Sequence, residues 1–299
     1  MSEQAVSGDA PSRGGRLPAG NGDASWRRHV TGAESARRLL QTVLGELLLP
    51  VGGSAWTSAF IEVMQRWGVE PGTTRQALAR MAGAGWLQAE RIGRQTRWCL
   101  TSRGATDLAA AKKRVWEFAN RVDSWDGRWL VVMASVPESD RSMRHFMRTR
   151  LGWAGLGSPA PGVWVGTQTE RLRDVQEVLT QSRVADTAQI FVAEHMGSAD
   201  QVQAMVSEAW DLRAIEADYD DFLSKFSLSQ ASDELQRTLE LVHAWRPFPW
   251  RDPALPKQLL PPTWRANEAA TLFRAKHGQW WQAACDQWCE LNSQGSPRG

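Results

Sequence analysis

The first third of the chain carries apolar residues at the three- and four-residue spacing of amphipathic helices. One stripe begins after Ser35, a suitable helix N-cap, and ends before Pro50. A second stripe spans Trp56–Trp67, and a third follows Pro71, a residue suited to the first turn of a helix. The pattern therefore predicts three consecutive helices. The inward positions of the first two are Leu39, Leu40, Val43, Leu44, Leu47, Leu48, Trp56, Phe60, Val63, Met64 and Trp67.

The third helix has two chemically different faces when its residues are spaced about 100° apart. Thr74, Ala77, Leu78, Met81 and Ala82 fall on a packing face, whereas the opposite face is polar and cationic. After Gly85 the pattern becomes two short alternating strands that turn at Gly93. A helix followed by a hairpin with a basic tip is typical of a winged helix-turn-helix. The outward helical residues are Thr73, Gln76, Ala79 and Arg80, with Arg75 on the flank, and the hairpin arginines are Arg91, Arg94 and Arg97.

Residues 128–197 alternate between apolar strands and amphipathic helices. Strands are expected at 128–135, 162–167 and 188–193, with a helix in each interval. This alternation predicts a small ferredoxin-like α/β domain. Beyond it, helical spacing dominates to Trp288, except in the proline-rich connector Pro247–Pro262. Because proline lacks an N–H and disrupts a helix interior, the connector is expected as an ordered, non-helical loop.

These patterns predict an α+β protein with an N-terminal winged helix-turn-helix, a middle ferredoxin-like α/β domain and a C-terminal helical domain. The expected divisions are a disordered tail at 1–33, the DNA-binding domain at 34–112, a linker helix at 113–127, the middle domain at 128–197, the helical domain at 198–292 and a disordered tail at 293–299.

The formal net charge of +2 is unevenly distributed along the chain. Residues 35–103 carry nine Arg against four Glu, whereas residues 104–299 carry 22 basic and 25 acidic groups. A basic module on a mildly acidic body indicates a polyanion partner, although a solvated basic surface has the same charge pattern. Arg and Gln make bidentate contacts with guanine and adenine, and a helix start suits phosphate. We therefore expect double-stranded DNA to contact Thr73, Thr74, Arg75, Gln76, Arg80, Arg91, Arg94, Gln95 and Arg97.

Composition and motifs narrow the remaining classes of function. No apolar run reaches the about 20 residues of a membrane helix, no signal-peptide pattern opens the chain, and three cysteines without CxxC favour a cytoplasmic location. The GxSxG, Walker A, GxGxxG and HExxH motifs are absent, so no cofactor or enzymatic activity is expected. His277, Cys285 and Cys289 lack a fourth zinc ligand at a recognisable spacing. Both cysteines are therefore expected as buried core thiols.

Several stretches resemble the PaaX family of phenylacetic acid degradation repressors. They are SARRLLQTVLGELLLPVGGSAW, GTTRQALARMAGAGWLQAERIGRQTRWCLTSRG, WDGRWLVV, AWDL and WRPFPWRDPALPKQLLPPTW, in the family's order between Ser35 and Trp281. The resemblance implies a homodimeric transcriptional repressor with two recognition helices on a near-palindromic operator. It also implies a middle domain similar to the CRISPR adaptation nucleases, and an aryl-CoA effector, phenylacetyl-CoA in the named members, that releases DNA.

The similarity to nucleases raises one enzymatic alternative. Those nucleases place a metal-binding Asp at the end of the first strand, before a hydrophobic-Pro pair. Here Ser135 occupies that position, ahead of Val136 and Pro137. Serine is a poor ligand for Mg²⁺, and Asp126 and Asp140 lie off the strand end. Metal-dependent cleavage is therefore the disfavoured alternative.

An acyl-CoA effector requires an apolar slot and cations for its phosphates. Most of the 17 Trp residues fall at core spacing, so core packing is the competing interpretation for each aromatic candidate. The expected effector-binding residues are Trp164, Trp245, Arg246, Trp250, Arg251, Lys257 and Trp264. The effector's identity, and the choice between repressor and activator, stay open at this point.

Overall fold

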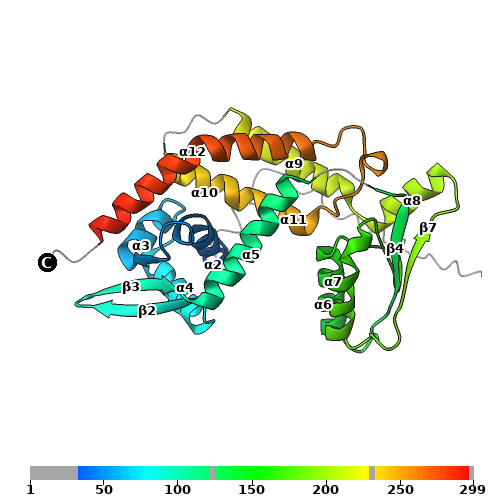
Figure 1. The fold of residues 1–299 in the computed structure, drawn as a ribbon, viewed down its shortest axis with the longest axis horizontal. Coiled ribbons are helices and arrows are strands. Elements are labelled where there is room, and N and C mark those ends of the chain that lie inside the picture. Colours follow the sequence, from blue (N-terminus) through cyan, green and yellow to red (C-terminus); the bar gives the residue numbers. More distant parts are fainter. Residues whose placement is uncertain (1–32, 122–124, 229–232, 296–299) are drawn as a thin grey trace, which may run out of the picture.

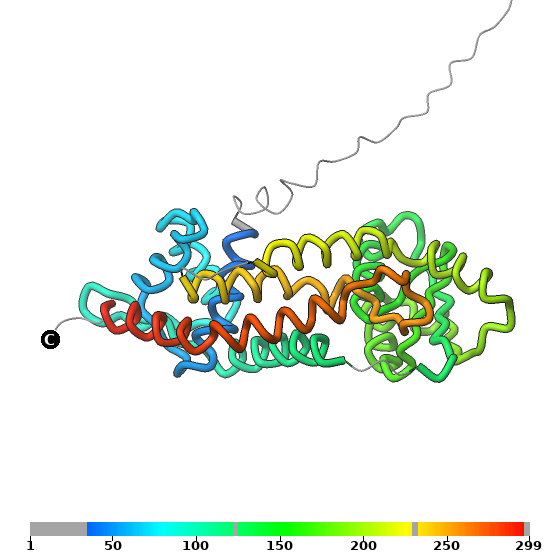
Figure 2. Tube along the Cα trace, turned by 90° about the horizontal axis from the view of Figure 1, so that it is seen from above, coloured from blue at the N-terminus to red at the C-terminus, as the bar shows by residue number. Residues whose placement is uncertain are grey.

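The computed structural model describes residues 33–121, 125–228 and 233–295. The molecule is elongated, with a group of helices and a small sheet at one end and a second sheet with its own helices at the other (Figure 1, Figure 2). The C-terminal helices extend between the two ends. Most of the two expected tails lies outside the described residues.

The N-terminal part contains the three helices that the apolar stripes predict. Helix α2 (Ala33–Val43) continues into a π-helical segment, η1 (Leu44–Leu48), and is followed by α3 (Thr57–Gln65) and α4 (Pro71–Gly83). Pro71 lies in the first turn of α4, as expected. The prediction that Trp56 belongs to the second helix is wrong. Its backbone is extended and it ends a short strand, β1 (Ser54–Trp56), because it pairs with the hairpin.

The hairpin is part of a three-stranded antiparallel sheet. Strands β2 (Leu87–Ile92) and β3 (Gln95–Leu100) form the hairpin, and β1 pairs with the other edge of β3. The buried Trp98 indole donates to the Thr57 hydroxyl at 2.9 Å, which ties the sheet to the start of α3. The hairpin is thus held against the helices by a strand that sequence periodicity alone did not predict.

Helix α5 (Ser102–Ala119) leaves the hairpin directly and begins before the expected linker helix. The Thr101 hydroxyl caps it by accepting from the Gly104 N–H and donating to the Gly85 carbonyl at 2.7 Å. A Cβ at Gly104 would lie 2.3 Å from the Trp86 carbonyl oxygen, so only glycine permits this approach. The first turn of α5 therefore packs directly on the junction between α4 and the hairpin.

The middle part has the element order β-α-β-β-α-β, and its four-stranded sheet has the order β5-β6-β4-β7 with antiparallel neighbours. The alternation of strands and helices is as predicted, except that strand β5 was missed because its residues, GSPA, show no apolar alternation. The elements are β4 (Arg128–Met133), α6 (Arg141–Trp153), β5 (Gly157–Ala160), β6 (Val163–Gly166), the 3₁₀ turn η2 (Thr169–Arg171), α7 (Leu172–Gln181) and β7 (Gln189–Glu194).

The two faces of this sheet are covered by different elements. Helices α6 and α7 enclose Leu130, Val132 and Trp164 on one face. Helix α8 (Ala199–Ala209) packs on the other through Val206, near Trp129. The sequence predicts that the C-terminal domain begins at residue 198. In the structure, α8 instead shares a core with the four-stranded sheet of the middle part.

The C-terminal part is helical, as predicted, with α9 (Leu212–Ser227), α10 (Glu234–Trp245) and α12 (Ala266–Gln294). The prediction that the proline-rich connector contains no helix is wrong. It forms one short turn, α11 (Phe248–Arg251), and a 3₁₀ turn, η3 (Lys257–Leu259). Prolines at the start of α11 need no N–H donor there, which is why the turn forms. Among the described residues, every helix is too short or too polar to span a bilayer.

The C-terminal helices complete the core of the N-terminal part. Leu235, Leu239 and Trp288 are buried in one cluster with the apolar faces of α2, α3 and α4. The Trp288 ring meets Phe60 edge-on, with centroids 5.4 Å apart, and Asn292 accepts a hydrogen bond from the Trp56 N–H. The N-terminal helices and the C-terminal helices are therefore one packed body.

The two C-terminal cysteines differ in exposure. Cys285 is buried, and burial raises the pKa of its thiol to about 11. Cys289 is exposed, so the expectation of two buried thiols is wrong for it. Residues four apart on a helix point about 40° apart, which is enough for Cys285 to face the core while Cys289 faces solvent. His277 pairs instead with the buried Glu46 at 2.6 Å, and Lys112 lies 3.3 Å from that carboxylate.

His243 links α10 to α2 and provides a pH-dependent test of this packing. Its Nδ1 lies 3.0 Å from the Thr42 hydroxyl. Burial, and then the charge of Arg246, lowers the pKa of His243 from 6.5 to about 4. The unfolded chain therefore takes up a proton at a higher pH than the folded chain, so stability is complete above about pH 6.5 and falls as the pH drops toward 4.

We expect the unfolding temperature to fall between about pH 7 and about pH 5, and His243→Gln to reduce the size of that fall. Differential scanning calorimetry of both proteins measures it. The matched control is His195→Gln, the same substitution at an exposed side chain. An identical pH dependence in the His243 variant would contradict the assignment.

Candidate functional site

Helix α4 presents the two faces that its sequence predicts. Ala77, Leu78 and Met81 are buried against the neighbouring helices. Arg75, Gln76 and Arg80 are exposed, and Thr73 is partly exposed. Thr74 is fully buried, and its hydroxyl donates to the Glu70 carbonyl. The structure therefore directs Arg75, Gln76 and Arg80 outward and turns the Thr74 side chain inward.

The hairpin places its basic residues on both sides of a two-residue turn. Ile92 pairs with Gln95, so Gly93 and Arg94 form the tip, and Gly93 has a φ of 60°. Arg91, Arg94 and Gln95 are exposed. Arg97 lies opposite Glu90 across the hairpin and bonds its carboxylate at 2.7 Å. Of the hairpin arginines, Arg97 thus has a neutralising partner on the adjacent strand.

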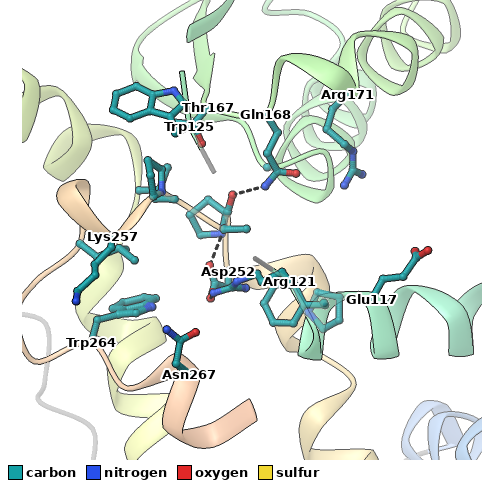
Figure 3. Close-up of a pocket in the computed structure, with 18 of the residues that line it drawn as sticks. Glu117, Arg121, Trp125, Thr167, Gln168, Arg171, Asp252, Lys257, Trp264 and Asn267 are labelled. Carbon is teal, nitrogen blue, oxygen red and sulfur yellow. Dashed lines mark hydrogen bonds and ion pairs between the residues drawn. The ribbon is translucent and has the colours of Figure 1, made fainter. Parts of the chain in front are cut away.

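A second candidate site lies at the C-terminal end of α5, the helix whose first turn follows the hairpin. A cavity of about 680 Å³ is enclosed by the end of α5, the middle domain and the proline-rich connector (Figure 3). Phe118 and Arg121 come from the α5 side, Arg171 from the middle domain, Lys257 from the connector and Trp264 from just after it. Gln168 crosses the gap and donates to the Pro253 carbonyl at 3.0 Å. The cavity therefore lies where the end of α5, the middle domain and the proline-rich connector meet.

Asp252 organises the floor of the cavity. Its buried carboxylate accepts from Arg121 at 2.9 Å, from the Tyr219 hydroxyl at 2.5 Å and from the Ala254 N–H. Burial, and then the Asp252 charge, holds the pKa of Tyr219 well above its ordinary value, so the phenol remains a donor. Two buried donors in the lining, Arg121 Nη1 and Trp264 Nε1, have no hydrogen-bond partner among the described residues.

Two further arginines form the rim next to the middle domain. Arg114 donates to the carbonyls of Trp153 and Pro249, and so joins α5 to the middle domain and to the connector. Burial, and then the nearby charge of Arg171, lowers the pKa of Arg114. Arg171 pairs with Asp174 on its own helix at 2.7 Å. This rim is a concentration of positive charge in which Arg114 is partly buried.

The structure does not bring the seven expected effector residues together. Lys257 and Trp264 line the cavity. Trp164 and Trp245 are buried in two different cores, although Trp245 also borders a smaller hollow of about 550 Å³. The other three lie outside the cavity lining: Arg246 bonds Thr42, Trp250 lies under the Arg114 guanidinium, and Arg251 pairs with Asp218.

Sequence reasoning missed the arginines that dominate the cavity. Arg114 lies in the last turns of α5, whereas Arg121 follows the end of that helix, so helical spacing does not bring the two together. For Arg171 the sequence held no local signal of a site, because its neighbours in the cavity come from segments far away along the chain.

The positions considered for a nuclease are occupied by local interactions. Ser135 is exposed just beyond β4. Asp126 pairs with Arg128, and Asp140 caps α6 by accepting from the Met143 N–H. In the part of the chain that the structure describes, no group of three or more His, Cys, Asp or Glu side chains is placed to hold a metal ion.

Comparison with known proteins covers nearly the whole described chain. Three family profiles match in order: PaaX-like protein at residues 35–104, PaaX protein central Cas2-like domain at 122–205, and PaaX-like protein C-terminal domain at 210–290. Transcriptional repressor PaaX of Escherichia coli (strain K12) is 30% identical over 251 residues, which span 80% of this chain and 78% of that protein.

A solved structure, uncharacterized protein Rv0674 from Mycobacterium tuberculosis, has a similar fold. It superposes with a TM-score of 0.55 at 22% identity, over 83% of this chain and 96% of that one. At this identity the similarity bears on the fold alone. The ordered matches to three profiles, together with the identity to the Escherichia coli repressor, give the assignment: the chain belongs to the PaaX family.

Proposed function

We propose that the protein is a DNA-binding transcriptional repressor and that its N-terminal part is a winged helix-turn-helix. The observation that carries the proposal is the joint presentation of Arg75, Gln76 and Arg80 on α4 and Arg94 at the hairpin tip. A helix of this kind fits a major groove, and a basic hairpin fits the adjacent backbone. The relative from Escherichia coli, named as a transcriptional repressor, supports the same function.

Within this proposal the exposed residues divide into two roles. Arg80 and Gln76 read base edges, because guanidinium and amide groups form bidentate pairs with guanine and adenine. Arg91 and Arg94 bind phosphates, which hold the helix in register without reading sequence. A homodimer doubles these contacts on a near-palindromic operator. The assembly acts as a regulator without catalysis, in the cytoplasm.

We further propose that an aryl-CoA thioester, such as phenylacetyl-CoA, releases the protein from an operator of an aromatic-acid catabolic operon. The resemblance described above suggests this ligand class. Release requires that the ligand bind the DNA-free conformation more tightly than the DNA-bound one, because only differential affinity shifts an equilibrium.

Two arginine substitutions separate base reading from phosphate binding. Arg80→Ala should weaken binding to the operator by about 1–3 kcal/mol and relax the preference for one base pair. Arg94→Ala should weaken binding equally on operator and unrelated DNA, and lower the salt slope by about one. Fluorescence anisotropy with operator and scrambled duplexes, at several salt concentrations, measures both effects.

The exposed Arg213 of α9 gives the matched control, since Arg213→Ala removes the same charge far from the proposed interface. It should leave both affinities unchanged. If Arg80→Ala and Arg94→Ala also leave them unchanged, the N-terminal part is not the DNA-binding surface and the proposed function fails.

A further inference from the structure

We propose that the cavity at the end of α5 binds an anionic ligand with a planar apolar group, and that the ligand acts on the hairpin end of the molecule through α5. The proposal rests on the proposed function only for its regulatory consequence. Ligand binding itself is a property of the cavity and is tested without DNA.

The lining offers donors that the protein leaves unused. Arg121 Nη1 and Trp264 Nε1 are both buried, and neither has a partner among the described residues. A buried polar group without a partner is unfavourable, so such groups in native proteins call for a ligand, a water or an ion. An acceptor atom of a bound ligand would give either donor the partner that it lacks.

The rim offers positive charge that burial makes costly. Arg114 and Arg171 both reach the Trp153 carbonyl, so two guanidinium groups converge on one neutral oxygen. The lowered pKa of Arg114 reflects its burial first and the charge of Arg171 second. A phosphate or carboxylate bound here would offset both effects, and an arginine fork suits either group.

The lining also offers apolar surface for a flat group. Trp125, Trp153 and Trp264 line the cavity together with a run of connector prolines, and Trp125 and Trp264 are seen in Figure 3. A volume of about 680 Å³ lies within the range typical of small-molecule sites. Lys257 stands at the connector side, across the cavity from Arg171 (Figure 3). The shape and charge therefore favour a ligand with an aromatic or acyl end and an anionic end.

Helix α5 connects this cavity to the proposed DNA-binding surface. Its C-terminal third supplies Arg114 and Phe118 to the lining, and its first turn packs on Trp86 through Gly104. An anion that draws the Arg114 guanidinium away from the Trp153 and Pro249 carbonyls removes two of the bonds that hold α5 to the middle domain and the connector. Movement of α5 then changes the position of the hairpin, because the two are joined at Thr101.

Three probes test the site on the full-length protein in the absence of DNA: phenylacetyl-CoA, CoA and phenylacetate. Isothermal titration calorimetry measures binding. We expect phenylacetyl-CoA to bind most tightly, and Arg171→Gln or Lys257→Gln to weaken it at least about tenfold. Arg173→Gln removes the same charge from the exposed side of α7 and should leave binding unchanged. Tighter binding of phenylacetate than of the thioester would point to an aromatic acid as the ligand of the same site.

Two results would overturn the proposal. One is the absence of binding by all three probes, and the other is binding that Arg171→Gln and Lys257→Gln leave unaltered. Amide hydrogen exchange tests the coupling: bound ligand should change exchange near Thr101 and Gly104, and unchanged exchange there rejects transmission through α5. Because none of these measurements contains DNA, a failure of operator binding is seen separately, in the anisotropy series.

Discussion

Replacing Arg121 by methionine is expected to lower the free energy of unfolding by about 3–5 kcal/mol. The substitution removes the cation from Asp252, whose side chain is completely buried. The remaining donors, Tyr219 and the Ala254 N–H, are neutral and cannot balance a buried carboxylate. Methionine retains most of the volume of the arginine side chain. The expected loss of stability therefore comes from the uncompensated charge of Asp252 and not from a cavity. Urea unfolding followed by circular dichroism measures the change.

Two comparisons make this expectation specific. Arg251→Met breaks a neighbouring ion pair with Asp218 that is more exposed to solvent. The Arg251 side chain is 49% exposed and the Asp218 side chain 32% exposed. That variant should lose no more than about 1 kcal/mol. Adding Asp252→Asn to Arg121→Met should recover part of the loss, because the uncompensated charge is then gone. Equal losses for Arg121→Met and Arg251→Met would contradict the buried pair as the cause.

The second large effect is expected at Trp245. This side chain is fully buried, stacks on Phe273 with centroids 4.9 Å apart, and contacts Phe222 and Phe248. Trp245→Ala should reduce the free energy of unfolding by about 3–5 kcal/mol, because it leaves a large cavity among aromatic rings that cannot collapse. The same urea titration measures it.

Trp250→Ala is the control for this substitution. Trp250 is half-buried and lies 5.1 Å from the Arg114 guanidinium, so its loss should cost about 1 kcal/mol. The pair also discriminates between core packing and effector binding at Trp245. If Trp245→Ala preserves stability while it abolishes effector binding, this residue is a ligand contact after all, and the core assignment fails.

The sequence predicts the helices and the hairpin of the N-terminal part because their signals are local. The third helix depends on a 3.6-residue period, and the hairpin on alternation around Gly93. Trp56 and the strand β5 depend instead on pairing with distant residues. Neither the register of Trp56 with Arg97 nor that of Gly157 with Val165 leaves a local trace.

The same distinction separates the two sites. The outward face of α4 is contained in one helix, so its geometry follows from residue spacing alone. The cavity takes its walls from three separate segments, and spacing within each says nothing of their distance in space. Lys257 and Trp264 were among the residues expected to bind an acyl-CoA, which needs cationic and aromatic groups. Arg171 joins them only because the middle domain packs against the proline-rich connector.

The buried position of Trp288 has an evolutionary consequence. A recombination event that moved residues 35–104 into another protein would leave behind α10 and α12, whose Leu235, Leu239 and Trp288 close the same core. The transplanted segment would expose the apolar surface that these side chains cover. Inheritance of the N-terminal segment is thus linked to inheritance of the C-terminal helices.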